Sequence, residues 1–164
     1  FRGGELMTRL KIGIQVFLPI FFATIIVVFP VVIKWFTPTR IKGVDSVAES
    51  MVNVASIDLG LFAAIIGVIV AFWDRTVFVK MRESGETQFQ FFALEAMALI
   101  SNFALLMGTL VVQIRANFNN SVQTVVLTTW LVLIIVAVYF TFQALLIMFK
   151  TVIYADEKKQ IYIK

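Results

Sequence analysis

The chain alternates between long apolar runs and short polar segments. The apolar runs cover about residues 12–33, 52–73, 89–112 and 122–149. A helix rises about 1.5 Å per residue, so about 20 mostly apolar residues are needed to cross the hydrocarbon core of a bilayer. Each run reaches that length. The pattern therefore predicts an all-α fold, an integral membrane four-helix bundle that forms a single transmembrane domain over residues 1–164.

The third run carries polar side chains at regular intervals. Seven residues are nearly two helical turns, so side chains at that spacing share one face and drift by only about 20° per step. An acidic side chain in the middle of a lipid-facing helix costs roughly 2.5–3.5 kcal/mol on insertion scales. We therefore expect this face, called the polar stripe below, to contact other helices or a water-filled space. Its four members are Gln88, Glu95, Asn102 and Thr109.

The second run follows a polar loop and begins with a helix-start motif. Ser46 and Glu49 stand three residues apart, which is the spacing of a capping box and predicts a helix from about Val47. Residues 46–54 are amphipathic and are expected to lie in the headgroup region or to extend the bundle. Further along, small residues form one face, and small faces allow helices to approach closely in lipid. They are Ser56, Gly60, Ala64, Gly67 and Ala71.

Asp58 stands within the second run, and we place it near the outer end of that span. Two interpretations are open: an interface residue with access to water, or a residue that faces a pore. If copies assemble around an axis, each acid forms a ring, and acidic rings favour cations. Bulky apolar side chains on the same helix then suit a hydrophobic gate that closes a pore by dewetting. The candidates are Phe62, Ile65 and Ile69.

The basic residues predict the orientation. Ten Lys and Arg residues lie in the amino-terminal segment, in the loop after the second run and in the carboxyl-terminal tail, against four in the other two loops. The positive-inside rule then places both termini in the cytoplasm. The basic residues of the loop after the second run are explained by topology alone, or they contact anionic lipid headgroups or a phosphate-bearing ligand. They are Arg75, Lys80 and Arg82.

Composition narrows the chemistry. Of the 164 residues, 60% are hydrophobic and 15% charged, and the chain has neither histidine nor cysteine. Haem ligation by His or Cys, iron–sulfur clusters, typical zinc sites, disulfides and Ser–His or Cys–His catalysis are excluded together. We therefore expect no catalytic residue, no metal and no cofactor, and we do not expect an enzyme. The net charge of +4 is accounted for by basic residues beside the spans, so we do not expect nucleic acid as a partner.

The layout resembles the Rex-type four-span membrane effectors of phage-exclusion systems and related channel-forming partners of nucleotide-signalling defence enzymes. The shared features are a first span with prolines, a small-residue second span, a basic turn over residues 74–85, an acid-containing third span and a fourth span with a short charged tail. The resemblance implies a homo-oligomeric channel in the bacterial inner membrane. Such a channel depolarises the membrane once a partner protein or a nucleotide signal reports infection.

Three functions fit these patterns. The leading hypothesis is a gated, oligomeric, cation-leaning membrane channel in which Glu95, Asn102 and Asp58 face the water path. The alternative is a non-catalytic accessory or assembly subunit of a larger membrane complex, in which the polar stripe contacts a partner and nothing passes through. A third hypothesis is a small proton-coupled carrier that uses Glu95.

Overall fold

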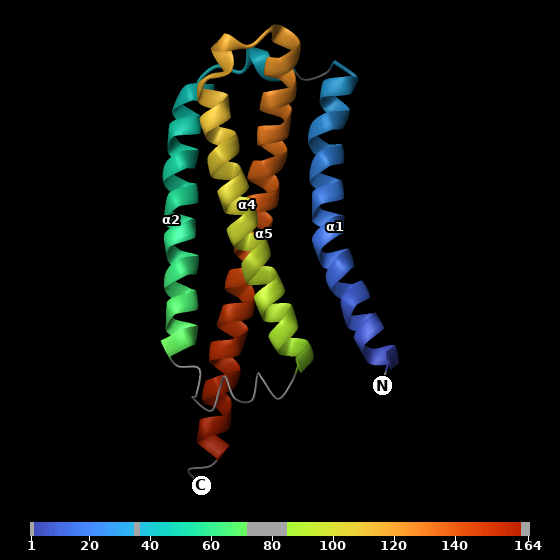
Figure 1. The fold of residues 1–164 in the computed structure, drawn as a ribbon, viewed down its shortest axis with the longest axis vertical. Helices are drawn as coiled ribbons and strands as arrows, with labels where there is room; N and C mark the ends of the chain where they lie inside the picture. Colours follow the sequence, from blue (N-terminus) through green and yellow to red (C-terminus); the bar gives the residue numbers. More distant parts are fainter. Residues whose placement is uncertain (1, 35–36, 72–84, 162–164) are drawn as a thin grey trace.

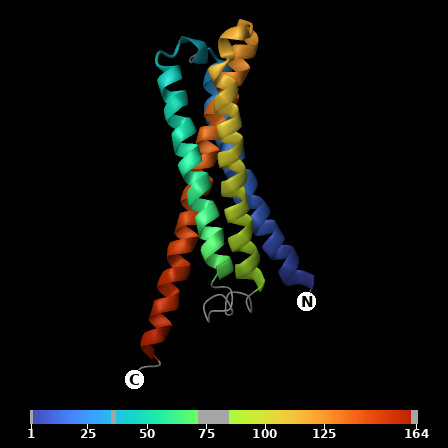
Figure 2. The same cartoon turned by 60° about the vertical axis from the view of Figure 1, so that its left-hand side comes forward.

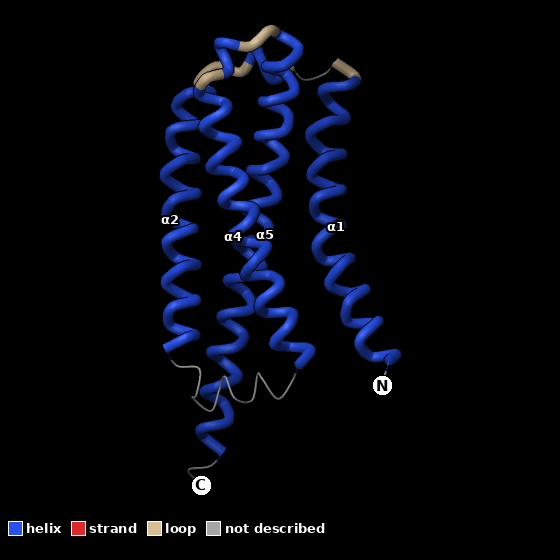
Figure 3. The backbone as a smooth tube through the Cα atoms, in the orientation of Figure 1, coloured by secondary structure: helices blue, strands red, loops and turns tan. Residues whose placement is uncertain are grey.

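A computed structural model describes residues 2–34, 37–71 and 85–161 of the chain, with side chains described for residues 10, 13–34, 37–71 and 88–150. The described part is helical apart from short turns (Figures 1 and 3). Its long helices are α1 (Arg2–Val32), α2 (Val44–Ala71), α4 (Gly85–Gln113) and α5 (Asn120–Ile161). Two single-turn helices, η1 (Pro38–Arg40) and η2 (Arg115–Asn117), lie in the connections.

Four helices are long and apolar enough to cross a membrane, as the hydrophobic pattern predicts. The candidate spans are Gly13–Val32, Val44–Ala71, Gln88–Gln113 and Asn120–Lys150. Large apolar side chains such as Phe17 remain exposed on the outside of the helices. An apolar exterior of this kind suits a lipid environment, so the fold is compatible with an integral membrane protein.

Successive long helices run in opposite directions, so the first helix begins and the last helix ends at the same end of the molecule (Figure 1). Helix α4 lies between α2 and α5 and packs against both. Helix α1 packs mainly on α5 and diverges from it towards its amino-terminal end, where Gln15 accepts a hydrogen bond from Gln90 of α4 (Figures 1 and 2). The core of the protein is therefore the three-helix unit α2–α4–α5, with α1 added to one side.

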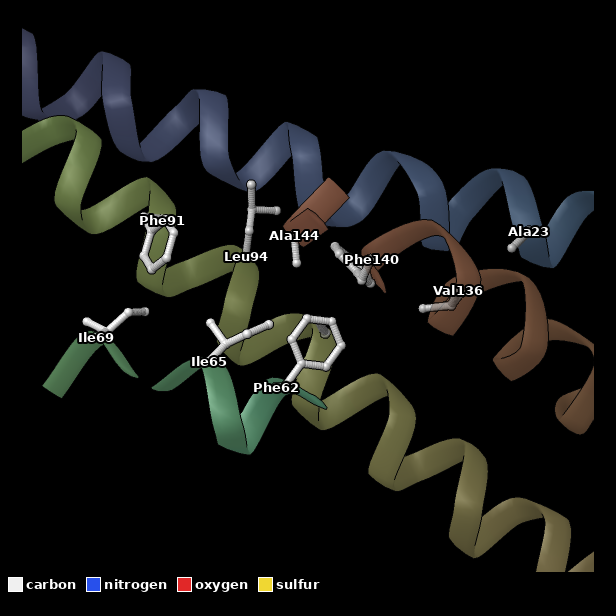
Figure 4. Packing of buried hydrophobic residues seen from close by; sticks show 10 residues of the cluster. Ala23, Phe62, Ile65, Ile69, Phe91, Leu94, Val136, Phe140 and Ala144 are labelled. Carbon is white, nitrogen blue, oxygen red and sulfur yellow. The ribbon is translucent and has the colours of Figure 1, made fainter. Parts of the chain in front are cut away.

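Two apolar clusters fill this unit. The terminus-side cluster, in the half of the bundle nearer the chain ends, comprises Ala23, Phe62, Ile65, Ile69, Phe91, Leu94, Ala98, Val136, Phe140 and Ala144 (Figure 4). The loop-side cluster, in the half nearer η1 and η2, comprises Val44, Ala48, Ala55, Leu105, Val112, Leu127, Trp130 and Ala137. The side chains expected to form a gate, Phe62, Ile65 and Ile69, are thus part of the packed core of a single chain.

Helix α2 begins earlier than its sequence motif predicts. Gly43 has φ +78°, a left-handed conformation that favours glycine, and its carbonyl accepts a hydrogen bond from the Val47 N–H. The helix therefore starts at Val44, which is buried in the loop-side cluster. Ser46 lies inside the first turn, so the capping-box prediction is wrong. The earlier start also moves Asp58 from the expected outer end of a span to the middle of α2.

A close contact between α4 and α5 involves a glycine that the sequence analysis does not single out. A Cβ atom on Gly108 would lie 2.9 Å from Cδ1 of Leu133 and 3.9 Å from Cδ1 of Trp130. Real Cβ atoms essentially never approach another atom so closely, and any side chain here would push Leu133 aside. Gly108 therefore lets α5 approach the backbone of α4, which is the role that small residues commonly have between membrane helices.

The packing of α5 gives a matched test. Phe140 is 1% exposed in the terminus-side cluster, whereas Phe142, two residues later, is 59% exposed on the outer surface. Phe140→Ala should lower the free energy of unfolding by about 3 kcal/mol, the low end for buried aromatic truncations, because separated helices still lie in an apolar solvent. Phe142→Ala should change it little. Thermal melting of both purified variants checks this, and equal losses would contradict the assignment of the core.

Candidate functional site

The polar stripe lies inside the bundle. Glu95, Asn102 and Thr109 are 3%, 1% and 0% exposed, and Gln88, near the start of α4, is half-buried. These residues alternate along α4 with the buried apolar residues Phe91, Ala98, Leu105 and Val112. Together the two sets occupy the two inward positions of a seven-residue repeat, the pattern by which one helix packs against its neighbours in a coiled coil. The stripe therefore faces protein on α2 and α5.

Thr109 closes the loop-side end of the buried stripe. Its Oγ1 accepts a hydrogen bond from Nε1 of Trp130 at 2.9 Å and donates one to the Leu105 carbonyl at 2.7 Å. Both side chains are buried, so the indole N–H of α5 and the hydroxyl of α4 satisfy each other inside the loop-side cluster. This pair fixes the height of α5 against α4.

Asn102 forms the centre of a network that joins three helices. Its Nδ2 donates to Oγ1 of Thr141 at 2.8 Å and to the Ala98 carbonyl at 3.0 Å. The Thr141 hydroxyl in turn donates to Oδ2 of Asp58 at 3.4 Å. Asp58 of α2, Asn102 of α4 and Thr141 of α5 therefore meet at mid-height of the bundle. Asp58 and Asn102 are recognisable in the sequence as candidate site residues, whereas Thr141 has no signal of its own within a long apolar run.

Glu95 differs from the other buried members of the stripe. It lies two helical turns, about 10 Å, from Asn102 along α4, towards the chain ends. Both of its carboxyl oxygens are buried and have no hydrogen-bond partner in the structure. The antiparallel register that brings Asp58 to the level of Asn102 brings Ile65 to the level of Glu95. The carboxyl group is therefore held among apolar side chains of the terminus-side cluster.

The small-residue face of α2 lies on the opposite side of that helix from the core. Its members are exposed, and a Cβ atom built on Gly60 or Gly67 would meet nothing within 4 Å. At 100° per residue, two polar exposed residues nearer the start of α2 share this side. We call the whole strip the outward face of α2: Glu49, Asn53, Ser56, Gly60, Ala64, Gly67 and Ala71.

An ion pair joins the ends of α2 and α4 at the loop side. Arg115 donates from Nη1 to Oδ1 of Asp45 at 2.6 Å and from Nη2 to Oδ2 at 3.0 Å, and Nη1 also donates to the Val112 carbonyl at 3.1 Å. Two parallel bonds between a guanidinium and a carboxylate fix geometry as well as distance. The basic turn with Arg75, Lys80 and Arg82 lies outside the described residues.

Comparisons of the chain with protein-family models, with curated proteins and with solved structures find no match. The likeness to Rex-type effectors therefore stays an expectation from the layout of the sequence, and function has to be inferred from the geometry.

The Asn102 network predicts a measurable coupling. Thr141→Val removes the hydroxyl that links Asn102 to Asp58, and Asn102→Ala removes the same link from α4. In a double-mutant cycle, the losses of unfolding free energy caused by the two substitutions should be less than additive. The coupling energy should be about 0.6 to 1.7 kcal/mol, the range found for hydrogen bonds between membrane helices. Thr129→Val, an exposed threonine on the same helix, is the control and should show no coupling with Asn102→Ala. Strictly additive effects at Thr141 would contradict the network.

Proposed function

We propose that the protein is a homo-oligomeric, cation-leaning channel of the bacterial inner membrane, assembled around the outward face of α2. The observation that supports this most strongly is the composition of that face. It is polar at one end and small at the other, and the described residues of the same chain leave it exposed. In a bilayer, exposed Asn53 and Ser56 would meet hydrocarbon unless another protein surface or water covered them.

A second copy of the chain is the partner that best fits the outward face of α2. Gly60, Ala64 and Gly67 allow two helix backbones to approach closely, which is how helices associate in lipid without a strong hydrophobic driving force. Nearer the start of α2, the polar residues then face an axis shared by several copies. Glu49 would form an acidic ring there, and such rings favour cations.

The burial of the polar stripe changes which residues line this channel. Glu95 and Asn102 are covered within each copy, so a passage between copies is lined by the outward face of α2 instead. Phe62, Ile65 and Ile69 pack in the core of each copy. A dewetting gate made by these three side chains would therefore require α2 to rotate.

The runner-up is an accessory subunit of a larger membrane complex. The same exposed face of α2 favours it, with a different protein in place of the second copy. The two proposals differ in composition: a channel of this kind purifies as an assembly of one chain, whereas an accessory subunit purifies with a second chain. A role as a defence effector that depolarises the membrane is supported only by the resemblance to Rex-type effectors. It can be tested once ion conduction has been measured.

Ion flux through liposomes tests the channel. Purified protein in vesicles should release K⁺ down a gradient, and Gly60→Leu or Gly67→Leu should abolish most of that flux because the added side chain separates the paired helices. Val68→Leu, also exposed on α2 but on another side, should leave the flux unchanged. Glu49→Gln should reduce the preference for K⁺ over Cl⁻.

Native mass spectrometry of the same samples supplies the second readout. A ring of one chain that Gly60→Leu dissociates into folded single copies supports the proposal. Tight vesicles that contain helical, assembled protein contradict conduction. A monomer that conducts as well as the wild type contradicts assembly through α2.

A further inference from the structure

Glu95 is a buried carboxyl group that the proposed channel does not use. It is 3% exposed, and neither carboxyl oxygen has a hydrogen-bond partner. Its polar neighbours on α4, Ser101, Asn102 and Thr109, all donate hydrogen bonds to backbone carbonyls. The described residues therefore provide partners for the other buried polar side chains of this face and none for Glu95.

Few ionisable groups lie on the helices that surround it. Helix α2 contributes Asp58, two turns away and hydrogen-bonded by Thr141. Within residues 120–150, the part of α5 whose side chains are described, the ionisable groups are the half-buried Tyr139 and the exposed Lys150, and neither hydrogen-bonds the Glu95 carboxyl group. In α1, residues 13–32 have no ionisable side chain. Asp45 and Glu49 lie towards the far end of α2, so no residue with a described side chain supplies a counter-charge to an ionised Glu95.

The surroundings decide which ligand the carboxyl group accepts. A hard metal cation needs about six oxygen ligands, and Ile65, Phe91 and Leu94 supply none. An ionised carboxylate without a hydrogen bond, a counter-ion or water is strongly destabilised in apolar surroundings. A proton needs no further ligand and removes the charge. The proton is therefore the ligand that this site can hold while the bundle is packed.

We propose that Glu95 is a proton-binding site inside each copy of the chain. The protonated carboxyl group is part of the closed packing of the terminus-side cluster. Release of the proton requires water to reach Glu95, which means that α2 and α5 separate from α4 at that level. Proton binding and packing are thus linked within a single chain, and testing this link requires neither conduction nor assembly through α2.

Carbodiimide labelling tests the site on the full chain. A protonated carboxyl group gives its proton to a carbodiimide nitrogen while its oxygen bonds to the central carbon, and rearrangement to the N-acylurea retains the whole reagent. Membrane-soluble dicyclohexylcarbodiimide should add one reagent mass per chain at Glu95, less as the pH is raised. A water-soluble carbodiimide should label exposed Glu49 and spare Glu95. Glu95→Gln should remove the adduct, and Glu49→Gln should retain it.

Thermal melting supplies an independent readout. The packed state binds the proton more tightly than the open state, so wild-type stability should fall as the pH rises through the range in which labelling is lost. Glu95→Gln should flatten that fall and melt above the wild type at alkaline pH, whereas Asp58→Asn should keep the fall.

Three results would overturn the proposal. They are labelling of Glu95 that does not fall as the pH is raised, equal labelling of Glu95 by the water-soluble reagent, and a pH dependence of melting that Glu95→Gln leaves unchanged. Peptide mapping of the wild type alone decides the first two if the variant does not fold. Tight vesicles in the K⁺ assay leave all three readouts intact, so failure of the channel and failure of the proton site are distinguishable.

Discussion

Polar groups within a bilayer-spanning bundle have to be covered by protein or water, and the arrangement of the helices follows from this constraint. Helix α4 carries one polar and one apolar residue in each seven-residue repeat of its inward seam. Glu95 is covered by apolar side chains, whereas Asn102 and Thr109 require a surface that offers hydrogen-bond partners at the right heights. Trp130 and Thr141 of α5 and Asp58 of α2 are at those heights. The seam therefore determines how α2 and α5 are placed along α4.

A comparison of hydrogen-bond and packing energies indicates that the polar stripe mainly sets the alignment of α5 along α4. A hydrogen bond between membrane helices is worth only about 0.6 kcal/mol on average, less than the burial of one large apolar side chain. The two apolar clusters therefore hold the bundle together. A shift of α5 by one turn would keep much of that apolar contact but would leave the indole N–H of Trp130 and one amide hydrogen of Asn102 unpaired in a dry interior, at about 1–3 kcal/mol each. The polar residues thus disfavour the shifted registers of α5 against α4 that apolar packing alone would tolerate.

Much of the fold could be predicted from the sequence, because run length and composition identify helices that can cross a bilayer. The polar stripe could be found as well, since a seven-residue spacing is visible without partners. The start of α2 could not, because it depends on the left-handed conformation of Gly43 and on the burial of Val44. Thr141 and Gly108 were missed for a related reason: each matters only through a residue on another helix.

The sequence also could not show whether the small-residue face of α2 points towards the core of the chain or away from it. Small residues show that a close approach is allowed, but they do not say whether the partner is a helix of the same chain. In this protein the chain uses Gly108 of α4 for its own packing and leaves Gly60 and Gly67 of α2 uncovered. Two faces of one helix are thereby separated: the inward face packs against other helices of the chain, and the described residues leave the outward face uncovered.

The side of α2 that covers Glu95 of α4 and the exposed side of α2 that carries Gly67 lie back to back. Ile65 and Ile69 point into the core at the level of Glu95, while Gly67, between them in sequence, faces outward into open space. A helix turn is rigid on this scale, so a displacement of α2 that follows from pairing at Gly67 also moves the side chains that cover Glu95. Assembly at the outward face and protonation at the inward face would then bias the same movement. That connection requires only the packing of one helix, and no residue between the two sites has to transmit it.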